Sequence, residues 1–384
     1  MPRQCGVATF TYDLATNVGE REIVALHPPG EPGPYPAEVR HRIRRDVQGD
    51  YGYVAQALND CGVDVVSVQY DPDIWGGDEG SFVLDFVAPL DVPSVVTLHR
   101  VRRDASALQR RIVGELVERA GATIAMSRTA ADVLARVYHL DRDRIDVVPY
   151  GVSHLPFVAP DTIKPKLGMQ GKSVIFSFGQ LAPGKGFESV VEAMPAVIAT
   201  YPSARYVILG ASSPETIAAD GEAYRAGIEK RVAKLGLSEH VKFIDRFVGR
   251  VELCTWLEAA DVFVAPSPQL DQTVSGPLSY AMGAGKAIVS TRSAYAGEQL
   301  GGDRGKFVDS GTPEEYAQAI LGLLGDPDSR AAMGKRVYDH SRAMVWWEVG
   351  RRYRDIFDRA ARAGSRPASR AQQPTGRKLT AAVV

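Results

Sequence analysis

The chain has 384 residues, of which 45% are hydrophobic and 24% charged, and its formal net charge at pH 7 is −1. This length suits two domains, the composition is that of a soluble globular protein, and the charge gives no general argument for a nucleic-acid partner. The cysteines, Cys5, Cys61 and Cys254, form neither a metal-ligand spacing nor a disulfide framework, which predicts a reducing, cytoplasmic location. No apolar run approaches the roughly 20 residues that span a bilayer, and the N-terminus has no apolar signal core.

The first part of the chain alternates between predicted strands and helices. Residues 8–14 are predicted to form a helix with no strand before it. Either the usual first strand of such a domain is absent, or the given sequence starts after it. The predicted strands are 23–26, 63–70, 94–99, 123–126 and 145–148, and the predicted helices are 53–58, 109–120 and 129–138. The alternation predicts a mainly parallel sheet with helices on both faces, in which ligands bind at the carboxyl ends of the strands. That rim would hold Gly6, Tyr70, Asp71 and His99.

A second domain of similar design follows a predicted linker at 155–166, LPFVAPDTIKPK, which has three prolines and little periodicity. The predicted strands are 174–178, 206–209, 241–244, 262–265 and 287–290, and the helices are 187–199, 223–235, 251–259, 276–282 and 313–324. The predicted architecture is therefore two doubly wound domains, 1–154 and 167–345, facing across a cleft. A helix at 346–363, anchored by Trp346 and Trp347, and a disordered tail at 364–384 would follow.

The stretch SFGQLAPGKGFESVVEAM at 177–194 reads as strand, glycine-rich turn and helix. Gly179, Gly184 and Gly186 would let the backbone approach a ligand closely. The turn places Lys185 at a helix N-terminus, where free N–H groups and the helix dipole already favour an anion such as a diphosphate. The alternative is a plain connection with a solvated lysine, and the spacing matches neither the dinucleotide fingerprint nor the Walker pattern.

Four segments together resemble the family-4 glycosyltransferases: PYGV at 149–152, GQLAPGKG at 179–186, DVFVAPS at 261–267 and SGPLSYAMGAGKAIVS at 275–290. The opening CGVATFT at 5–11 resembles that of a bacterial subgroup with CGIATFT there. The resemblance implies a glycosyltransferase B fold whose final helix crosses back to the N-terminal domain. It also implies an enzyme that transfers sugar from a nucleotide sugar with retention and usually without an essential metal.

The resemblance also implies roles for particular residues. His99 and Lys185 would be catalytic, although a lone histidine is more often structural. The donor diphosphate and sugar would be bound by Gly6, Gln180, Lys185, Gln272, Ser275, Gly276 and Pro277, and the nucleotide by Tyr280 and Glu298. Tyr70, Asp71 and Trp75 would line an acceptor pocket, with loop packing as the alternative.

The chain departs from the family pattern at three of these positions. Gln180 stands where members usually carry arginine, and Gln272 and Tyr280 stand where they carry two glutamates. An amide can still hydrogen-bond a sugar hydroxyl, whereas a tyrosine cannot accept two hydrogen bonds from a ribose diol. The subgroup resemblance favours adaptation over decay.

The predicted activity is transfer of mannose or glucose, from GDP-mannose first and UDP-glucose second, to a sugar-containing or other hydroxyl acceptor. The alternatives are a retaining glycoside phosphorylase and a catalytically weak sugar- or nucleotide-binding protein. No carboxylate pair supports a two-carboxylate hydrolase. Two arginine clusters could attract an anionic membrane surface or form a solvated face: Arg40, Arg42, Arg44 and Arg45, and Arg100, Arg102 and Arg103.

Overall fold

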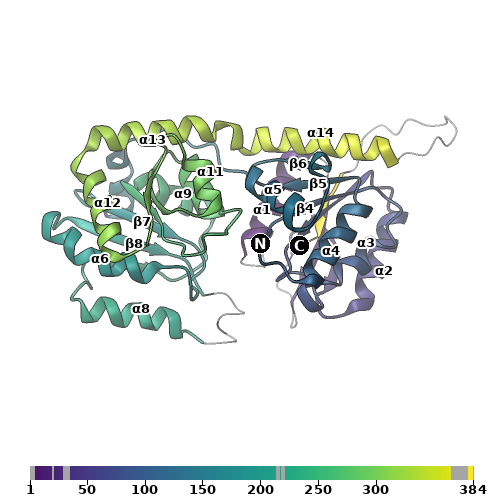
Figure 1. Cartoon of the computed structure of the whole chain (residues 1–384), viewed down its shortest axis with the longest axis horizontal. Helices are drawn as coiled ribbons and strands as arrows, with labels where there is room; N and C mark the ends of the chain where they lie inside the picture. The colour runs from purple at the N-terminus through teal and green to yellow at the C-terminus, as the bar shows by residue number, and fades with distance from the viewer. Residues whose placement is uncertain are drawn as a thin grey trace. The chain divides into compact units, whose positions relative to one another are not determined.

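The computed structural model describes residues 5–19, 21–28, 35–212, 217, 221–364 and 379–383. It divides into two compact units, the first made of Met1–Gly151 with Trp346–Val384 and the second of Val152–Val345. Figure 1 shows that each unit is a sheet packed against helices, and all the strand pairs are parallel. The predicted α/β class with two Rossmann-like sheets is confirmed.

The first unit has a sheet of seven strands in the order β2-β1-β13-β3-β4-β5-β6. Its strands are β1 (Arg21–His27), β2 (Val39–Arg44), β3 (Val65–Tyr70), β4 (Ser94–Leu98), β5 (Ala122–Ala125), β6 (Ile145–Val147) and β13 (Leu379–Val383). Its α-helices are α1 (Gly6–Val18), α2 (Gln48–Asp60), α3 (Val83–Val87), α4 (Ala107–Arg119), α5 (Arg128–Val137) and α14 (Trp346–Gly364). Strands β3, β4 and β5 are buried throughout, which is why their apolar runs were predictable.

Strand β13 corrects one prediction. The tail 364–384 was expected to be disordered, but Leu379–Val383 pairs with β1 on one side and β3 on the other. In the described chain no strand precedes α1, so without β13 the facing edges of β1 and β3 would leave backbone N–H and C=O groups unpaired. An apolar segment can satisfy those groups wherever it lies in the sequence. The prediction for 365–378 and 384 lies outside the described residues.

Helix α14 begins with one buried tryptophan, not two. Trp346 is 5% exposed and packs on Phe10, with ring centroids 5.1 Å apart, and against Gly151. Trp347 is 61% exposed. The predicted apolar anchor of this helix is therefore Trp346 alone.

The second unit has six strands in the order β12-β11-β10-β7-β8-β9. The strands are β7 (Ser173–Phe178), β8 (Ala204–Leu209), β9 (Val241–Ile244), β10 (Val262–Ala265), β11 (Ala287–Thr291) and β12 (Lys306–Val308). The α-helices with stated bounds are α6 (Phe187–Thr200), α8 (Ala223–Lys234), α9 (Arg250–Ala259), α10 (Gly276–Gly283), α11 (Ala294–Leu300), α12 (Pro313–Gly325) and α13 (Pro327–Ser341). The chain order reverses between β7 and β10, and ligands of such sheets bind at the carboxyl ends of the strands at this switch point.

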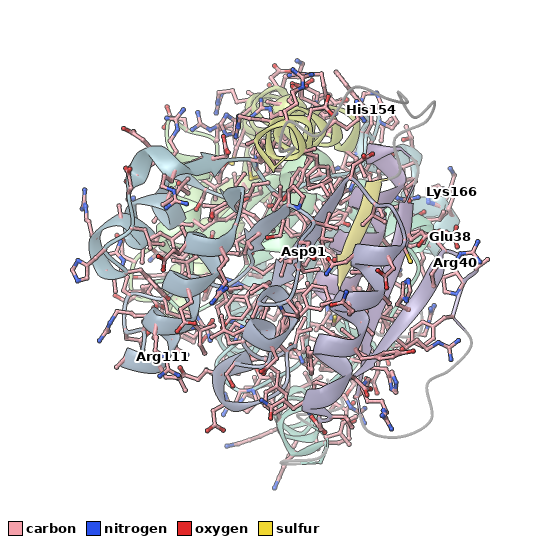
Figure 2. All side chains as sticks on the ribbon, turned by 90° about the vertical axis from the view of Figure 1, so that its right-hand side faces the viewer. Glu38, Arg40, Asp91, Arg111, His154 and Lys166 are labelled. Carbon is pink, nitrogen blue, oxygen red and sulfur yellow. The ribbon has the colours of Figure 1, made fainter. Side chains whose placement is uncertain are left out.

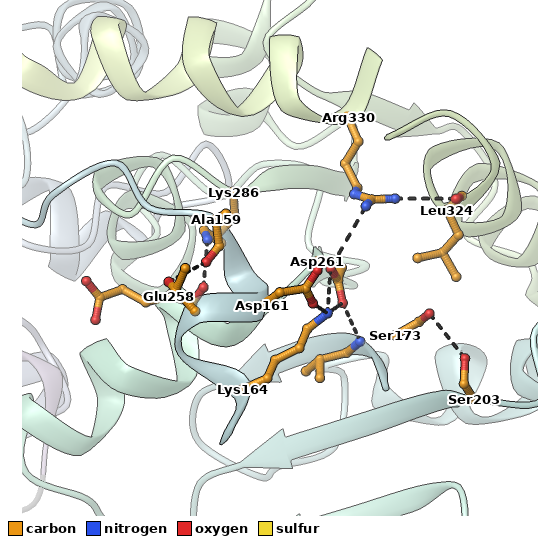
Figure 3. Close-up of polar contacts among 12 residues, drawn as sticks. Ala159, Asp161, Lys164, Ser173, Ser203, Glu258, Asp261, Lys286, Leu324 and Arg330 are labelled. Carbon is orange, nitrogen blue, oxygen red and sulfur yellow. Dashed lines mark hydrogen bonds and ion pairs between the residues drawn. The ribbon is translucent and has the colours of Figure 1, made fainter. Parts of the chain in front are cut away.

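The predicted linker 155–166 lies inside the second unit and is held there by a buried ion pair (Figure 3). Lys164 is 4% exposed, and its Nζ lies 2.8 Å from Oδ2 of Asp261 and 2.7 Å from Oδ1 of Asp161. Oδ2 of Asp261 also accepts a hydrogen bond of 2.7 Å from the backbone N–H of Val174. The aspartate of the DVFVAPS segment therefore joins the start of β10 to β7 and to the proline-rich segment.

Lys286, next to this ion pair in Figure 3, is a second buried lysine. Its Nζ donates a hydrogen bond of 3.0 Å to the carbonyl of Glu258. Burial lowers the pKa of Lys286 to about 8, although the nearby charge of Asp261 opposes this shift. The protonated amine is thus less stable in the folded chain than in the unfolded chain.

We therefore expect Lys286→Met to raise the free energy of unfolding at pH 7 by about 2 to 3 kcal/mol, since each pKa unit corresponds to about 1.4 kcal/mol and the Glu258 carbonyl loses its donor. Between about pH 8 and the ordinary lysine pKa of 10.5, the unfolded chain holds a proton that the folded chain has released. The free energy of unfolding of the wild type therefore rises with pH in this range, and its difference from the variant becomes smaller. Urea unfolding at pH 7 and pH 10 measures the gap. An equal gap at both pH values would contradict this account.

Candidate functional site

The glycine-rich turn after β7 has the predicted strand, turn and helix form. Gly179 and Gly186 have φ angles of +145° and +79°, which favour glycine. A Cβ at Gly186 would lie 1.9 Å from the carbonyl oxygen of Pro266, in the loop after β10. The two loops at the switch point therefore touch. Lys185, in the first of these loops and just before α6, is half-buried, and Gln180 is exposed.

The N-terminus of α10 lies against the same turn. A Cβ on Gly179 would meet Cγ of Pro277 at 3.6 Å. Ser275 caps the helix, its Oγ accepting a hydrogen bond of 3.3 Å from the backbone N–H of Leu278. The carbonyl of Gln272 accepts one of 2.9 Å from the N–H of Tyr295, which fixes the preceding loop to α11. The structure thus brings Ser275, Gly276 and Pro277 to the edge of the turn that carries Lys185.

The two residues predicted to contact the nucleotide lie on α10 and α11. Tyr280 is 6% exposed, and its ring stands edge-on to Phe178, the last residue of β7, with centroids 6.1 Å apart. Glu298 is half-buried and accepts a hydrogen bond of 3.3 Å from Nε2 of Gln299. The two helices are joined by a hydrogen bond of 2.7 Å between the Ser279 and Tyr295 hydroxyls. Tyr280 therefore packs beside the residue from which the glycine turn departs.

In the first unit, His99 follows β4 at the carboxyl rim. Its backbone N–H donates to the carbonyl of Tyr70 at 2.9 Å, and its Nε2 lies 2.7 Å from Oε1 of Gln69. The ring of Phe10, one turn into the helix that begins at Gly6, stands edge-on to the imidazole at 5.0 Å. Burial lowers the pKa of His99 to about 3. His99 is therefore a neutral hydrogen-bonding group at ordinary pH, not a cation.

Tyr70 and Trp75, predicted either to line an acceptor pocket or to pack the loop, are both buried. Tyr70 is fully buried and its hydroxyl donates to the carbonyl of Glu79 at 2.8 Å. Trp75 is 2% exposed, and its Nε1 donates to the carbonyl of Gln69 at 3.0 Å. Asp71 is also buried and accepts from the N–H of Asp73 at 3.0 Å. These side chains shape the loop after β3 from within.

Three of the four arginines in and just after β2 interact with neighbouring side chains. Arg44 forms a two-bond ion pair with Asp50, Arg45 pairs with Asp46, and Arg42 lies over the ring of Tyr35. Arg40 projects outward beside Glu38 (Figure 2). Within the described residues, no helix combines the length and hydrophobicity that crossing a membrane requires. In the same residues, no group of three or more His, Cys, Asp or Glu side chains is arranged to hold a metal ion.

Comparison with known proteins identifies both halves of the chain. Residues 5–154 match the model for Glycosyltransferase Family 4, and residues 160–340 match that for Glycosyl transferases group 1. A D-inositol 3-phosphate glycosyltransferase of Xylanimonas cellulosilytica is 28% identical over 71% of this chain and 67% of its own length. A GDP-mannose-dependent monoacylated alpha-(1-6)-phosphatidylinositol monomannoside mannosyltransferase of Corynebacterium glutamicum is 30% identical over 50% of this chain and 49% of its own.

The crystal structure of Anabaena Alr3699/HepE in complex with UDP-glucose has the same fold, with a TM-score of 0.75 and 17% identity over 93% of this chain and 97% of that one. The chain spans about two thirds of the length of the first curated relatives, 65% and 67%. The order of the two matched models follows the order of the two units. The chain belongs to the group 1, or family-4, glycosyltransferases.

Proposed function

We propose that this protein transfers a hexose from a nucleoside-diphosphate sugar to a hydroxyl acceptor with retention of configuration. The observation that carries the proposal is the contact of the Lys185 turn with the N-terminus of α10 at the switch point of the second sheet. Both elements present groups that favour an anion: an ammonium on the turn and backbone N–H groups at a helix start. A diphosphate with its sugar suits this pair.

In the proposed reaction the bond between the anomeric carbon and the diphosphate oxygen breaks as the acceptor oxygen bonds to the same face of the sugar. Lys185 stabilises the charge that grows on the leaving diphosphate, and the N–H groups of Ser275 and Gly276 hold phosphate or sugar oxygens. The acceptor proton leaves with the diphosphate. Catalysis then comes mainly from positioning and charge stabilisation, with no carboxylate nucleophile.

The other predicted residues have supporting roles in this proposal. Gln180 and Gln272 hydrogen-bond the diphosphate and the sugar, Pro277 shapes the edge of the turn, and Glu298 reaches the ribose. Gly6 leaves room for the donor at the start of α1, and neutral His99 exchanges hydrogen bonds with donor hydroxyls. Asp71 holds the acceptor-side loop in place. No metal is required, and the location is cytoplasmic, with peripheral contact at the inner membrane face through the exposed Arg40 as an alternative.

GDP-mannose is the first candidate donor and UDP-glucose the second. A relative is named for its dependence on GDP-mannose, and a structural neighbour was crystallised with UDP-glucose. The phosphorylase alternative would need inorganic phosphate and no nucleotide. A binding protein would keep affinity for nucleotide without turnover.

Thermal unfolding with a panel of nucleotides and nucleotide sugars, repeated with EDTA, tests the proposal. A donor at 100 times its dissociation constant should stabilise the fold by about 2.7 kcal/mol. We expect GDP-mannose or UDP-glucose to raise the melting temperature more than inorganic phosphate, with or without EDTA. Stabilisation by phosphate alone, followed by phosphate-dependent cleavage of a disaccharide, would replace transfer with phosphorolysis.

Replacement of Tyr280 tests whether its pocket is adapted to the nucleotide. We expect Tyr280→Glu to weaken nucleotide binding about tenfold or more, because a carboxylate placed against Phe178 is costly to bury. Tyr280→Phe, which keeps the ring, is the matched control and should bind almost normally. Calorimetric titration with GDP and UDP measures both. Tighter binding by Tyr280→Glu would mean that the tyrosine marks a lost ribose contact.

A further inference from the structure

We propose that Gln69 is a positioning residue that holds the imidazole of His99 in the tautomer protonated on Nε2, which leaves Nδ1 as a hydrogen-bond acceptor. The catalytic part of this inference rests on the proposed role of His99 at the donor. The tautomer can be measured without any reaction.

Gln69 is fixed from several sides. It lies on β3 directly opposite Thr97 on β4, and Ser67 lies two residues before it on the same face of the sheet. The side chains of all three are fully buried. The backbone carbonyl of Gln69 accepts the hydrogen bond from Nε1 of Trp75. The glutamine therefore has little freedom to turn away from His99.

The amide hydrogen bonds fix the direction of the contact with His99. Nε2 of Gln69 lies 3.0 Å from Oγ of Ser67 and 3.4 Å from Oγ1 of Thr97, and Thr97 is itself 3.1 Å from the hydroxyl of Tyr353 on α14. An amide NH₂ has two protons to donate, and these two hydroxyls receive them. Oε1 then faces Nε2 of His99 at 2.7 Å and can only accept. The shared proton must therefore be on the histidine nitrogen.

The surroundings of His99 keep the imidazole neutral, so that it carries a single N–H. Burial is the cause of the low pKa of this side chain, and the Phe10 ring stands perpendicular to the imidazole with ring centroids 5.0 Å apart. In a neutral imidazole, a proton fixed on Nε2 leaves a lone pair on Nδ1. His99 would then accept a hydrogen bond from a substrate hydroxyl through Nδ1. Without Gln69 the two tautomers would interconvert, and part of the protein would present a donor in place of an acceptor.

The test is ¹⁵N NMR of the full chain labelled at histidine, with the signal of His99 among the seven histidines assigned from its loss in His99→Asn. We expect the wild-type protein to show the tautomer protonated on Nε2. Gln69→Leu should give an averaged or reversed pattern. Gln69→Glu keeps an acceptor oxygen and should keep Nε2 protonated. Thr123→Val, which removes a buried hydroxyl on β5 that lies outside this network, is the matched control and should leave the His99 tautomer unchanged.

Transfer kinetics provide the second measurement. Gln69→Leu should lower kcat by about 10- to 100-fold with little change in donor KM. This range lies between the effect of losing one hydrogen bond and the effect of holding a catalytic histidine entirely in the wrong tautomer. A wild-type His99 protonated on Nδ1, or an unchanged tautomer in Gln69→Leu, would overturn the inference and leave the proposed transferase intact. If Gln69→Leu does not fold, the wild-type and Gln69→Glu spectra still decide. An absence of transfer from every donor, with the expected tautomers, would instead contradict the proposed function alone.

Discussion

Replacing Lys185 with alanine is expected to reduce hexose transfer by about 100-fold or more, which is the usual loss when one preorganised electrostatic group is removed. Lys185 is the residue before Gly186, whose backbone caps α6 and fits against Pro266. The ammonium is thus carried by a turn whose position is set by backbone contacts. In the proposed reaction it meets the charge that develops on the leaving diphosphate, so its loss should lower kcat more than donor binding.

The controls for this variant are two other lysine changes. Lys185→Arg keeps the positive charge and should retain part of the activity. Lys166→Ala removes an exposed lysine of the same unit and should transfer normally. Initial rates at saturating donor, with folding checked by circular dichroism, give the comparison. A folded Lys185→Ala protein with near-normal turnover would remove Lys185 from the mechanism.

Asp261→Ala is expected to lower the free energy of unfolding of the second unit by about 3 to 5 kcal/mol, which is typical when one partner of a buried ion pair is removed. Among the described residues, the variant leaves the buried Lys164 ammonium with Asp161 as its one remaining carboxylate partner, and the side chain of Asp161 is 86% exposed. It also removes the acceptor of the Val174 N–H. The second loss falls on the start of β7, the strand that leads to the glycine turn.

Asp161→Ala is the matched control because it removes the exposed partner of the same lysine. It should cost at most about 1 kcal/mol. Urea unfolding of the full chain, followed with probes in each unit because two domains need not unfold together, measures the difference. Lys164→Met combined with Asp261→Ala should recover part of the loss. Equal losses in the free energy of unfolding for Asp261→Ala and Asp161→Ala would show that the buried ion pair contributes no more to stability than the exposed one.

Most of the fold could be predicted because buried parallel strands appear as apolar runs and their connecting helices as amphipathic segments. Strand β2 escaped prediction because it is an edge strand in which only Ile43 is fully buried. Strand β13 escaped because the partners of Leu379–Val383 lie more than 300 residues away in sequence, and no local pattern shows which segment completes a sheet. The prolines of 155–166 resembled a linker because the contact of Lys164 with Asp261 is equally remote.

The candidate site was predictable to the extent that backbone shape determines it. The Lys185 turn was found because its glycine spacing has a direct geometric meaning. The burial of Tyr70 and Trp75 was not predictable, because an aromatic residue in a loop looks the same in sequence whether it faces solvent or the core. Gln69 was missed because a glutamine within a strand gives no signal until the neighbouring strand places Thr97 opposite it.

The measurement that most directly tests the central claim is a transfer reaction with GDP-mannose or UDP-glucose, a panel of sugar and polyol acceptors, and NMR of the anomeric proton in the product. We predict release of the nucleoside diphosphate in step with a glycoside of the same anomeric configuration as the donor, in the presence of EDTA, and its near-complete loss in Lys185→Ala. An inverted product would contradict retention. Nucleotide binding with no product from any donor and acceptor would contradict transferase activity.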